Sequence, residues 1–221
     1  MDRPRLLISS RNYSSWSLRG FLLCRLAGLE ADVEAVNLDD PAVRAELLLQ
    51  SSSIRIPCLL MDGLRIWDTT AIAETLNERF PEARMLPTDP AARARCRSVA
   101  GEMHAGFQAL RASLPMNLRA HRPGFRIWSG PRADIERILS IWRECLGHWG
   151  GPWLMGEHPT IADAMYAPVV TRFLTYDVRL DGACATYGQR IMEWGPMADW
   201  VAAAQDEPEP PIHELDLDAE F

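Results

Sequence analysis

The 221-residue sequence lacks the features that mark several classes of protein. No apolar run approaches the roughly 20 residues of a membrane-spanning helix, so we expect no membrane span. The first ten residues, MDRPRLLISS, lack a long apolar segment followed by a small-residue cleavage site, which argues against a secretory signal. The five cysteines are scattered and form no CxxC pair, which argues against a disulfide framework and a structural zinc site. We therefore expect buried free thiols and a reducing, cytoplasmic compartment.

The sequence also lacks an excess of positive charge. Its formal net charge is −7, from 30 acidic and 23 basic side chains. Residues 206–221 hold seven of the acids and no Lys or Arg, so the rest of the chain is neutral. This distribution repels nucleic acid, which we do not expect as a partner. We expect residues 207–221 to form an acidic tail, part of which lies on the body through its apolar residues: Ile212, Leu215, Leu217 and Phe221.

What the sequence does contain is a change of pattern near residue 80. Strand patterns at 5–10, 33–38, 58–61 and 65–67 alternate with helical patterns at 15–29, 41–50 and 70–80. Asp62-Gly63 between the last two strands is a strong signal for a two-residue hairpin. The order is therefore βαβαββα, in which the first two strands are parallel and the hairpin adds an antiparallel edge.

Strand patterns cease after a proline-punctuated linker that contains Pro81, Pro87 and Pro90. Helical spacing then covers residues 91–114, 131–149, 160–176, 183–194 and 197–204. We predict an α/β domain at 1–82 followed by an all-helical domain at 88–206. Thr160 and Asp163 form a capping box at the start of one of these helices, a structural feature that contributes about 0.5–2 kcal/mol and carries no chemistry.

Residues 12–20, NYSSWSLRG, predict a polar loop that runs into a helix. Ser14 precedes that helix and Arg19 follows five residues later, which resembles the S-x-x-x-x-R spacing of the serine-type cytosolic glutathione transferases. The SSWS segment is similar to the SSCS segment of the zeta class, the maleylacetoacetate isomerases, with Trp16 in place of the cysteine.

A second segment, residues 55–76, strengthens this resemblance. Ile56-Pro57 resembles the [VI]-P dipeptide that begins the third strand in this family, where the peptide bond is cis, and Asp68-Thr69 stands where the family usually has [ED]-S. The Thr160 capping box is similar to the family's motif in its sixth helix. The resemblance covers about residues 5–200. It implies a thioredoxin-like N-terminal domain, glutathione as co-substrate, a small electrophile as the second substrate, a role in detoxification, and a homodimer.

The resemblance implies that Ser14 is the catalytic residue, which activates the glutathione thiol. A two-unit drop from a thiol pKa near 8.5 needs about 2.7 kcal/mol. A hydrogen bond from a hydroxyl to the thiolate supplies about 1.5–3 kcal/mol, and a helix N-terminus adds roughly 0.3–1 kcal/mol. No general base is then required. Ser15, Ser17 and Tyr13 are alternative hydroxyls, and Ser15 is also a candidate glutathione contact.

The other implied contacts of glutathione lie in the second segment. The Ile56 backbone, exposed if the bond to Pro57 is cis, pairs with the cysteinyl part. The Thr69 hydroxyl and amide hold the γ-glutamyl carboxylate, and Asp68 orients the γ-glutamyl ammonium. Arg55 lies close enough in sequence to contact the ligand near Ile56. Considered without the resemblance, Asp68-Thr69 is a plain helix cap and Arg55 a surface residue.

The acceptor pocket is expected between the two domains, lined by core or interface residues to which we assign no catalytic role: Met103, His104, Phe107, Leu110, Arg111, Phe173 and Tyr176. Cys24 and Cys58 fall inside a helix and a strand and are expected in the core, and the histidines show no metal-ligand spacing. The alternative to a glutathione enzyme is a non-catalytic interaction module on the same fold.

Overall fold

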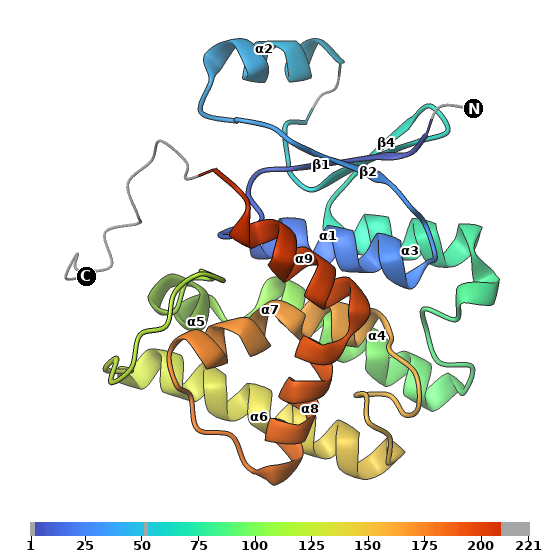
Figure 1. Ribbon diagram of the computed structural model, residues 1–221. Coiled ribbons are helices and arrows are strands. Elements are labelled where there is room, and N and C mark those ends of the chain that lie inside the picture. Colours follow the sequence, from blue (N-terminus) through green and yellow to red (C-terminus); the bar gives the residue numbers. More distant parts are fainter. Residues whose placement is uncertain (1–2, 51–52, 209–221) are drawn as a thin grey trace.

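The computed structural model describes residues 3–50 and 53–208 (Figure 1). The predicted packing of Ile212, Leu215, Leu217 and Phe221 lies outside the described residues. The first half of the chain contains the following elements: β1 (Arg5–Ile8), α1 (Ser15–Leu26), β2 (Asp32–Ala35), α2 (Pro41–Gln50), β3 (Cys58–Met61), β4 (Leu64–Trp67) and α3 (Thr69–Arg79). This is the predicted βαβαββα order.

The four described strands form one sheet in the order β2-β1-β3-β4. β1 and β2 are parallel, with Leu6 opposite Val33, whereas β3 is antiparallel to both β1 and β4. Asp62 and Gly63 join β3 to β4 with φ angles of 51° and 77°. Two consecutive positive φ angles are typical of the type I′ hairpin turn, so the predicted parallel pair and antiparallel edge are both confirmed.

The second half is helical. Its elements are η1 (Pro81–Ala83), α4 (Pro90–Ala105), α5 (Gln108–Ser113), α6 (Ser129–Trp149), α7 (Ile161–Thr175), α8 (Gly182–Glu193) and α9 (Gly195–Gln205). The single helix predicted over 91–114 is wrong, because the chain breaks at Gly106 and Phe107. Phe107 has a φ of 62°, and Asp134 of α6 accepts a hydrogen bond from the Leu110 amide at 2.8 Å, so α5 starts afresh with a cap from another helix.

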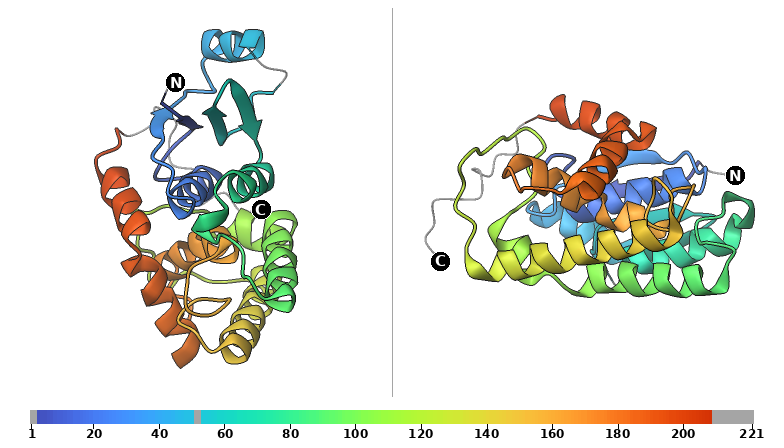
Figure 2. Two further views of the ribbon diagram at one scale, coloured as in Figure 1. Left: turned by 90° about the vertical axis from the view of Figure 1, so that its right-hand side faces the viewer. Right: turned by 90° about the horizontal axis from the view of Figure 1, so that it is seen from below.

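Helices cover both faces of the sheet. Figure 1 shows α2 on one face and α1 and α3 on the other, where they lie between the sheet and the helical half; Figure 2 shows the same layers from two further sides. Leu7, Leu47 and Cys58 form a small separate cluster beneath α2, whereas one continuous core joins α1 and α3 to the helical half. The loops before α1 and α3 therefore face the junction between the two halves.

The capping box at Thr160 is confirmed and deeply buried. The carboxylate of Asp163, which is 0% exposed, accepts four hydrogen bonds: from the Thr160 amide (2.8 Å), the Thr160 hydroxyl (3.0 Å), the Leu154 amide (3.0 Å) and the Tyr187 hydroxyl (3.1 Å). Burial raises the pKa of Asp163, and these hydrogen bonds act in the opposite direction. The box therefore anchors α7 to the preceding loop and to α8.

All five cysteines are buried free thiols, as expected. Burial raises the pKa of Cys24 to about 12 and that of Cys96 to about 11. Within residues 3–50 and 53–208, no helix combines the length and the apolar character that crossing a membrane requires.

Candidate active site

Ser14 is the N-cap of α1, and its hydroxyl ends a short chain of hydrogen bonds. The Ser9 amide donates to the Ser17 hydroxyl at 3.2 Å, and the Ser17 hydroxyl donates to Ser14 Oγ at 2.8 Å. The Ser17 amide also donates to Ser14 Oγ, at 3.2 Å. Because Ser14 Oγ accepts both bonds, its own proton is left to donate, and the contacts among the described residues include no acceptor for it. Such a chain polarises its last hydroxyl and makes it a better donor.

The alternative hydroxyls are placed differently. Ser17 is 0% exposed, and its hydroxyl is already used in the hydrogen bonds from Ser9 and to Ser14. Ser15 is 6% exposed, and its hydroxyl accepts a hydrogen bond from Arg172 of α7 at 3.2 Å. Tyr13, like Ser14, is half-buried. Among the serines of this segment, Ser14 is thus the one that combines partial exposure with an unused donor.

Ile56 and Pro57 precede β3 and are joined by a cis peptide bond, as the resemblance implies. Pro57 packs against α1 at Gly20, where a Cβ atom would lie 2.8 Å from both Cβ and Cγ of Pro57. This glycine therefore sets how closely the helix that starts after Ser14 approaches the turn at Ile56. Arg55 is exposed, and its amide donates to Ser53 Oγ at 3.1 Å.

Asp68 is the N-cap of α3. Its carboxylate accepts hydrogen bonds from the Thr70 amide at 2.7 Å and the Ala71 amide at 3.4 Å. Its φ angle of 77° lies in the left-handed region that non-glycine residues rarely adopt, and such backbone is often found at binding sites. Thr69, the first residue of α3, is 1% exposed. The pair is a helix cap, and that cap also places a carboxylate beside the positive end of a helix dipole.

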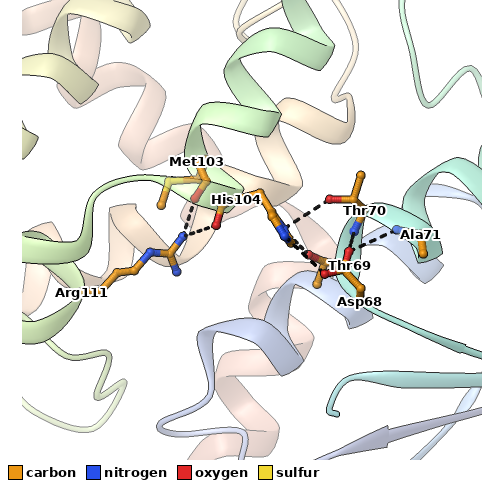
Figure 3. A network of polar contacts seen from close by, with 7 residues as sticks. All are labelled: Asp68, Thr69, Thr70, Ala71, Met103, His104 and Arg111. Carbon is orange, nitrogen blue, oxygen red and sulfur yellow. Dashed lines mark hydrogen bonds and ion pairs between the residues drawn. The ribbon is translucent and has the colours of Figure 1, made fainter. Parts of the chain in front are cut away.

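His104 of α4 reaches across from the helical half to this cap (Figure 3). Its Nε2 atom lies 3.3 Å from Asp68 Oδ2, and its Nδ1 atom lies 3.3 Å from the hydroxyl oxygens of both Thr69 and Thr70. The same ring packs edge-on against Trp16 of α1, with centroids 5.2 Å apart. His104 thereby links the first turn of α1 to the first turn of α3, a contact that the sequence did not reveal.

Comparison with known families decides which family this arrangement belongs to. Residues 13–79 match the glutathione S-transferase N-terminal domain, and residues 130–203 match the glutathione S-transferase C-terminal domain. The chain belongs to the glutathione S-transferase family. The two matches follow each other in the order that the sequence predicted, and they contain Ser14, Ile56-Pro57, Asp68-Thr69 and the Thr160 capping box.

Similar proteins include several maleylacetoacetate isomerases. The chain is 29% identical to that of Pseudomonas aeruginosa over 189 residues, which cover 77% of this chain and 82% of the relative. It is 25% identical to that of Rattus norvegicus over 181 residues, or 80% and 82% of the two chains. The solved structure of maleylacetoacetate isomerase from Anaeromyxobacter dehalogenans 2CP-1 is 26% identical, with a TM-score of 0.66 and 94% of each chain covered. The resemblance to the glutathione transferases, including their thioredoxin-like and helical domains, is confirmed.

The ring of Trp16, the residue that the sequence resemblance places at the zeta-class cysteine, contacts two arginines. The guanidinium of Arg19 is 4.8 Å from the centre of its ring, and that of Arg111 is 4.7 Å away. Arg111 also donates to the backbone carbonyls of Gly106 (3.1 Å), Met103 and His104 at the end of α4. The indole thus fixes Arg111 beside the loop that carries Ser14.

Arg172 joins Arg19 and Arg111 in a cationic cluster, in which Arg19 and Arg172 are buried and Arg111 is half-buried. Burial lowers the pKa of Arg19 well below its usual range, and the charges of Arg111 and Arg172 lower it further. Burial and the charge of Arg111 lower the pKa of Arg172 to about 10. Across the part of the chain that the structure describes, these three guanidiniums bond to carbonyl and hydroxyl oxygens and pair with no carboxylate. The described residues therefore place three positive charges close together with no carboxylate paired to them.

Proposed function

We propose that this member of the family is a glutathione transferase in which Ser14 stabilises the thiolate of glutathione. The observation that carries the proposal is the unused donor of Ser14, at the start of α1, with two hydrogen bonds directed onto its oxygen. A thiolate within hydrogen-bond distance of this hydroxyl receives one charge-assisted hydrogen bond and the positive end of the helix dipole. The thiol proton leaves to solvent, so no side chain has to act as a base.

The remainder of glutathione is proposed to bind along two loop-to-helix junctions. The Ile56 backbone pairs with the cysteinyl part, and Asp68 with Thr69 holds the γ-glutamyl group at the start of α3. His104 completes that end from the helical half, because it already contacts both residues. Ser15 contributes its backbone amide in the first turn of α1, since its hydroxyl is bonded to Arg172. Arg55 is exposed at the rim and is assigned to the ligand's outer, glycyl end.

We further propose a zeta-like isomerase reaction on an electrophile that carries a carboxylate. Two observations support this choice: the relatives named maleylacetoacetate isomerase, and the cationic cluster of Arg19, Arg111 and Arg172 next to Trp16. The Anaeromyxobacter isomerase has also been crystallised with dicarboxyethyl glutathione and citrate in its active site. In such a reaction the thiolate adds to an activated double bond, the resulting single bond rotates, and the C–S bond breaks to return the thiolate.

The isomerase relatives favour an enzyme over the non-catalytic interaction module. We propose that it acts as a homodimer, as the family resemblance implies, and in the cytoplasm, where five buried thiols stay reduced. Detoxification of small electrophiles is the corresponding cellular role. Light scattering of the purified protein tests the dimer: a mass near 25 kDa would exclude it and one near twice that value would support it.

Titration of glutathione into wild-type protein and the Ser14→Ala variant tests the function. Binding heat and thiolate absorbance are followed together. The Ser17→Ala variant serves as a matched control, because it removes the hydroxyl that donates a hydrogen bond to Ser14 Oγ. We expect binding by all three proteins, full thiolate in the wild type, reduced thiolate in Ser17→Ala and none in Ser14→Ala. Thiolate retained in Ser14→Ala would transfer the role to another hydroxyl. No binding by the wild type at millimolar glutathione would overturn the proposal.

A further inference from the structure

The loop that leads into Ser14 is held by the far end of the chain. Glu207, two residues after α9, directs its carboxylate into this loop. Its oxygens accept hydrogen bonds from the Arg11 amide at 2.7 Å, the Ser10 hydroxyl at 2.8 Å and the Asn12 amide at 3.0 Å. Three donors converge on one carboxylate, and three consecutive residues of the loop supply them. Figure 1 shows the end of α9 beside the start of α1.

Ser10 connects the Glu207 carboxylate by hydrogen bonds to Tyr13, the residue before Ser14. Its hydroxyl oxygen accepts hydrogen bonds from the amides of Asn12 and Tyr13, both at 3.1 Å, while its proton is given to Glu207. The carboxylate therefore fixes the Ser10 hydroxyl, and that hydroxyl fixes the backbone up to Tyr13. The next residue is Ser14.

Glu207 is itself held in place by the helical half. Arg119 donates to the backbone carbonyl of Ala204 at 2.9 Å and to that of Glu207. The amide of Arg119 donates to the side chain of Asn12 at 3.1 Å, and the indole of Trp200 in α9 donates to the Arg11 carbonyl at 3.0 Å. The contact is thus a built, multiply bonded junction between the loop and the C-terminal segment.

We propose that Glu207 is a positioning residue for the thiolate site: it sets the loop so that the Ser14 hydroxyl points at the sulfur of glutathione. This inference rests on the proposed function of Ser14. Glu207 touches none of the residues assigned to the γ-glutamyl end, so its removal acts on thiolate stabilisation more than on capture of glutathione. A displacement of Ser14 by about 1 Å is enough to lower the rate tenfold or more.

The test compares Glu207→Ala and Glu207→Gln with Asp206→Asn. Asp206 is the exposed neighbour of Glu207 in the chain. Asp206→Asn removes one negative charge, as Glu207→Gln does, but leaves the contacts of Glu207 with the loop in place. In Glu207→Ala we expect kcat to fall about tenfold, KM for glutathione to change less than about threefold, and less thiolate in the bound state. Glu207→Gln keeps one acceptor oxygen and restores part of the rate, whereas Asp206→Asn behaves as wild type.

A double-mutant cycle with Ser14→Ala separates positioning from general stability. If Glu207 acts through Ser14, Glu207→Ala has almost no further effect on the rate once Ser14 is removed, within about twofold. Full additivity of the two losses, or wild-type thiolate in Glu207→Ala, would overturn the positioning role and leave the proposed function standing. A wild-type protein without bound thiolate would overturn the proposed function and this inference together.

Discussion

The Nε2 atom of His104 lies 3.3 Å from the Oδ2 atom of Asp68, although the two residues belong to different halves of the molecule. The imidazole also lies within 3.3 Å of the Thr69 hydroxyl oxygen. One side chain of α4 thus holds both members of the acid–hydroxyl pair that starts α3. The glutathione site proposed at that pair is consequently built by the helical half as well as by the sheet domain.

His104→Ala is expected to raise KM for glutathione about tenfold and to change kcat by less than about threefold. The reason is the loss of the contact with the Asp68 carboxylate and of the hydrogen bonds with the Thr69 and Thr70 hydroxyls, a net loss of about 1.4 kcal/mol, which corresponds to the tenfold change. Steady-state kinetics with varied glutathione measures both constants. His148→Ala, at an exposed position in the last turn of α6, is the matched control and should leave both unchanged. An unaltered KM in His104→Ala would contradict the assigned role.

Gly20→Ala is expected to destabilise the fold by about 1–3 kcal/mol, because the new Cβ would lie 2.8 Å from two carbons of Pro57. The helix after Ser14 and the turn at Ile56 must then move apart, which also weakens glutathione binding. Chemical denaturation gives the stability change. Gly101→Ala in α4 meets no atom within 4 Å and should be neutral or stabilising by about 0.4–1 kcal/mol. Equal effects of the two substitutions would argue against the Pro57 contact.

The buried thiols are expected to resist alkylation in the folded protein at pH 8. Burial raises the pKa of Cys24, Cys145 and Cys184 to about 12 and that of Cys96 to about 11, from an ordinary 9.0. A thiol whose pKa is raised by folding stabilises the fold below pH 9, and that contribution is lost as the pH rises from 9 towards 12. Thiol-reagent titration of folded and urea-unfolded protein, with unfolding curves at pH 8 and 10, checks both statements. Rapid labelling of a folded thiol would contradict them.

Asp163→Ala is expected to cost about 3–5 kcal/mol, because three different residues lose the carboxylate to which they donate hydrogen bonds. Tyr187→Phe removes a single donor and should cost about 1 kcal/mol. Urea denaturation measures both. The rate per folded molecule should be unchanged, since the hydrogen-bond partners of Asp163 include none of the residues assigned to glutathione. A large fall in kcat in stably folded Tyr187→Phe would contradict this purely structural role.

Local signals in the sequence were enough to predict most of the fold. The Asp62-Gly63 hairpin, the Thr160 capping box and the alternation of strands with helices each depend on neighbouring residues. The break at Phe107 was not predictable from local sequence. Phe107 is buried with a left-handed backbone, and the helix that follows is capped by Asp134, which accepts a hydrogen bond from the Leu110 amide 24 positions away in the chain. The apolar spacing continues across the break.

The candidate site was only partly accessible to sequence reasoning. Ser14, Ile56-Pro57 and Asp68-Thr69 stood out because each lies at a loop-to-helix or loop-to-strand junction with a recognisable pattern. The sequence places His104 and Arg111 among the residues expected to line the acceptor pocket, without a role, and does not single out Arg172; the contacts of these three side chains across the two halves give them their place in the site. The sequence assigns Glu207 to an acidic tail, since none of its neighbours along the chain indicates that three donors of the loop before α1 bond to its carboxylate.

The hydrogen bonds between Glu207 and the loop before Ser14 form late in the folding of the newly made chain. Asn12 and Glu207 are separated by 195 positions, so the ribosome makes the loop long before it makes the carboxylate that holds it. Domains generally fold as units as they emerge, so the sheet and its helices are complete while the amides of Arg11 and Asn12 still bond to water. A nascent chain therefore has the hydroxyl of Ser14 well before it has Glu207, the residue proposed to orient that hydroxyl.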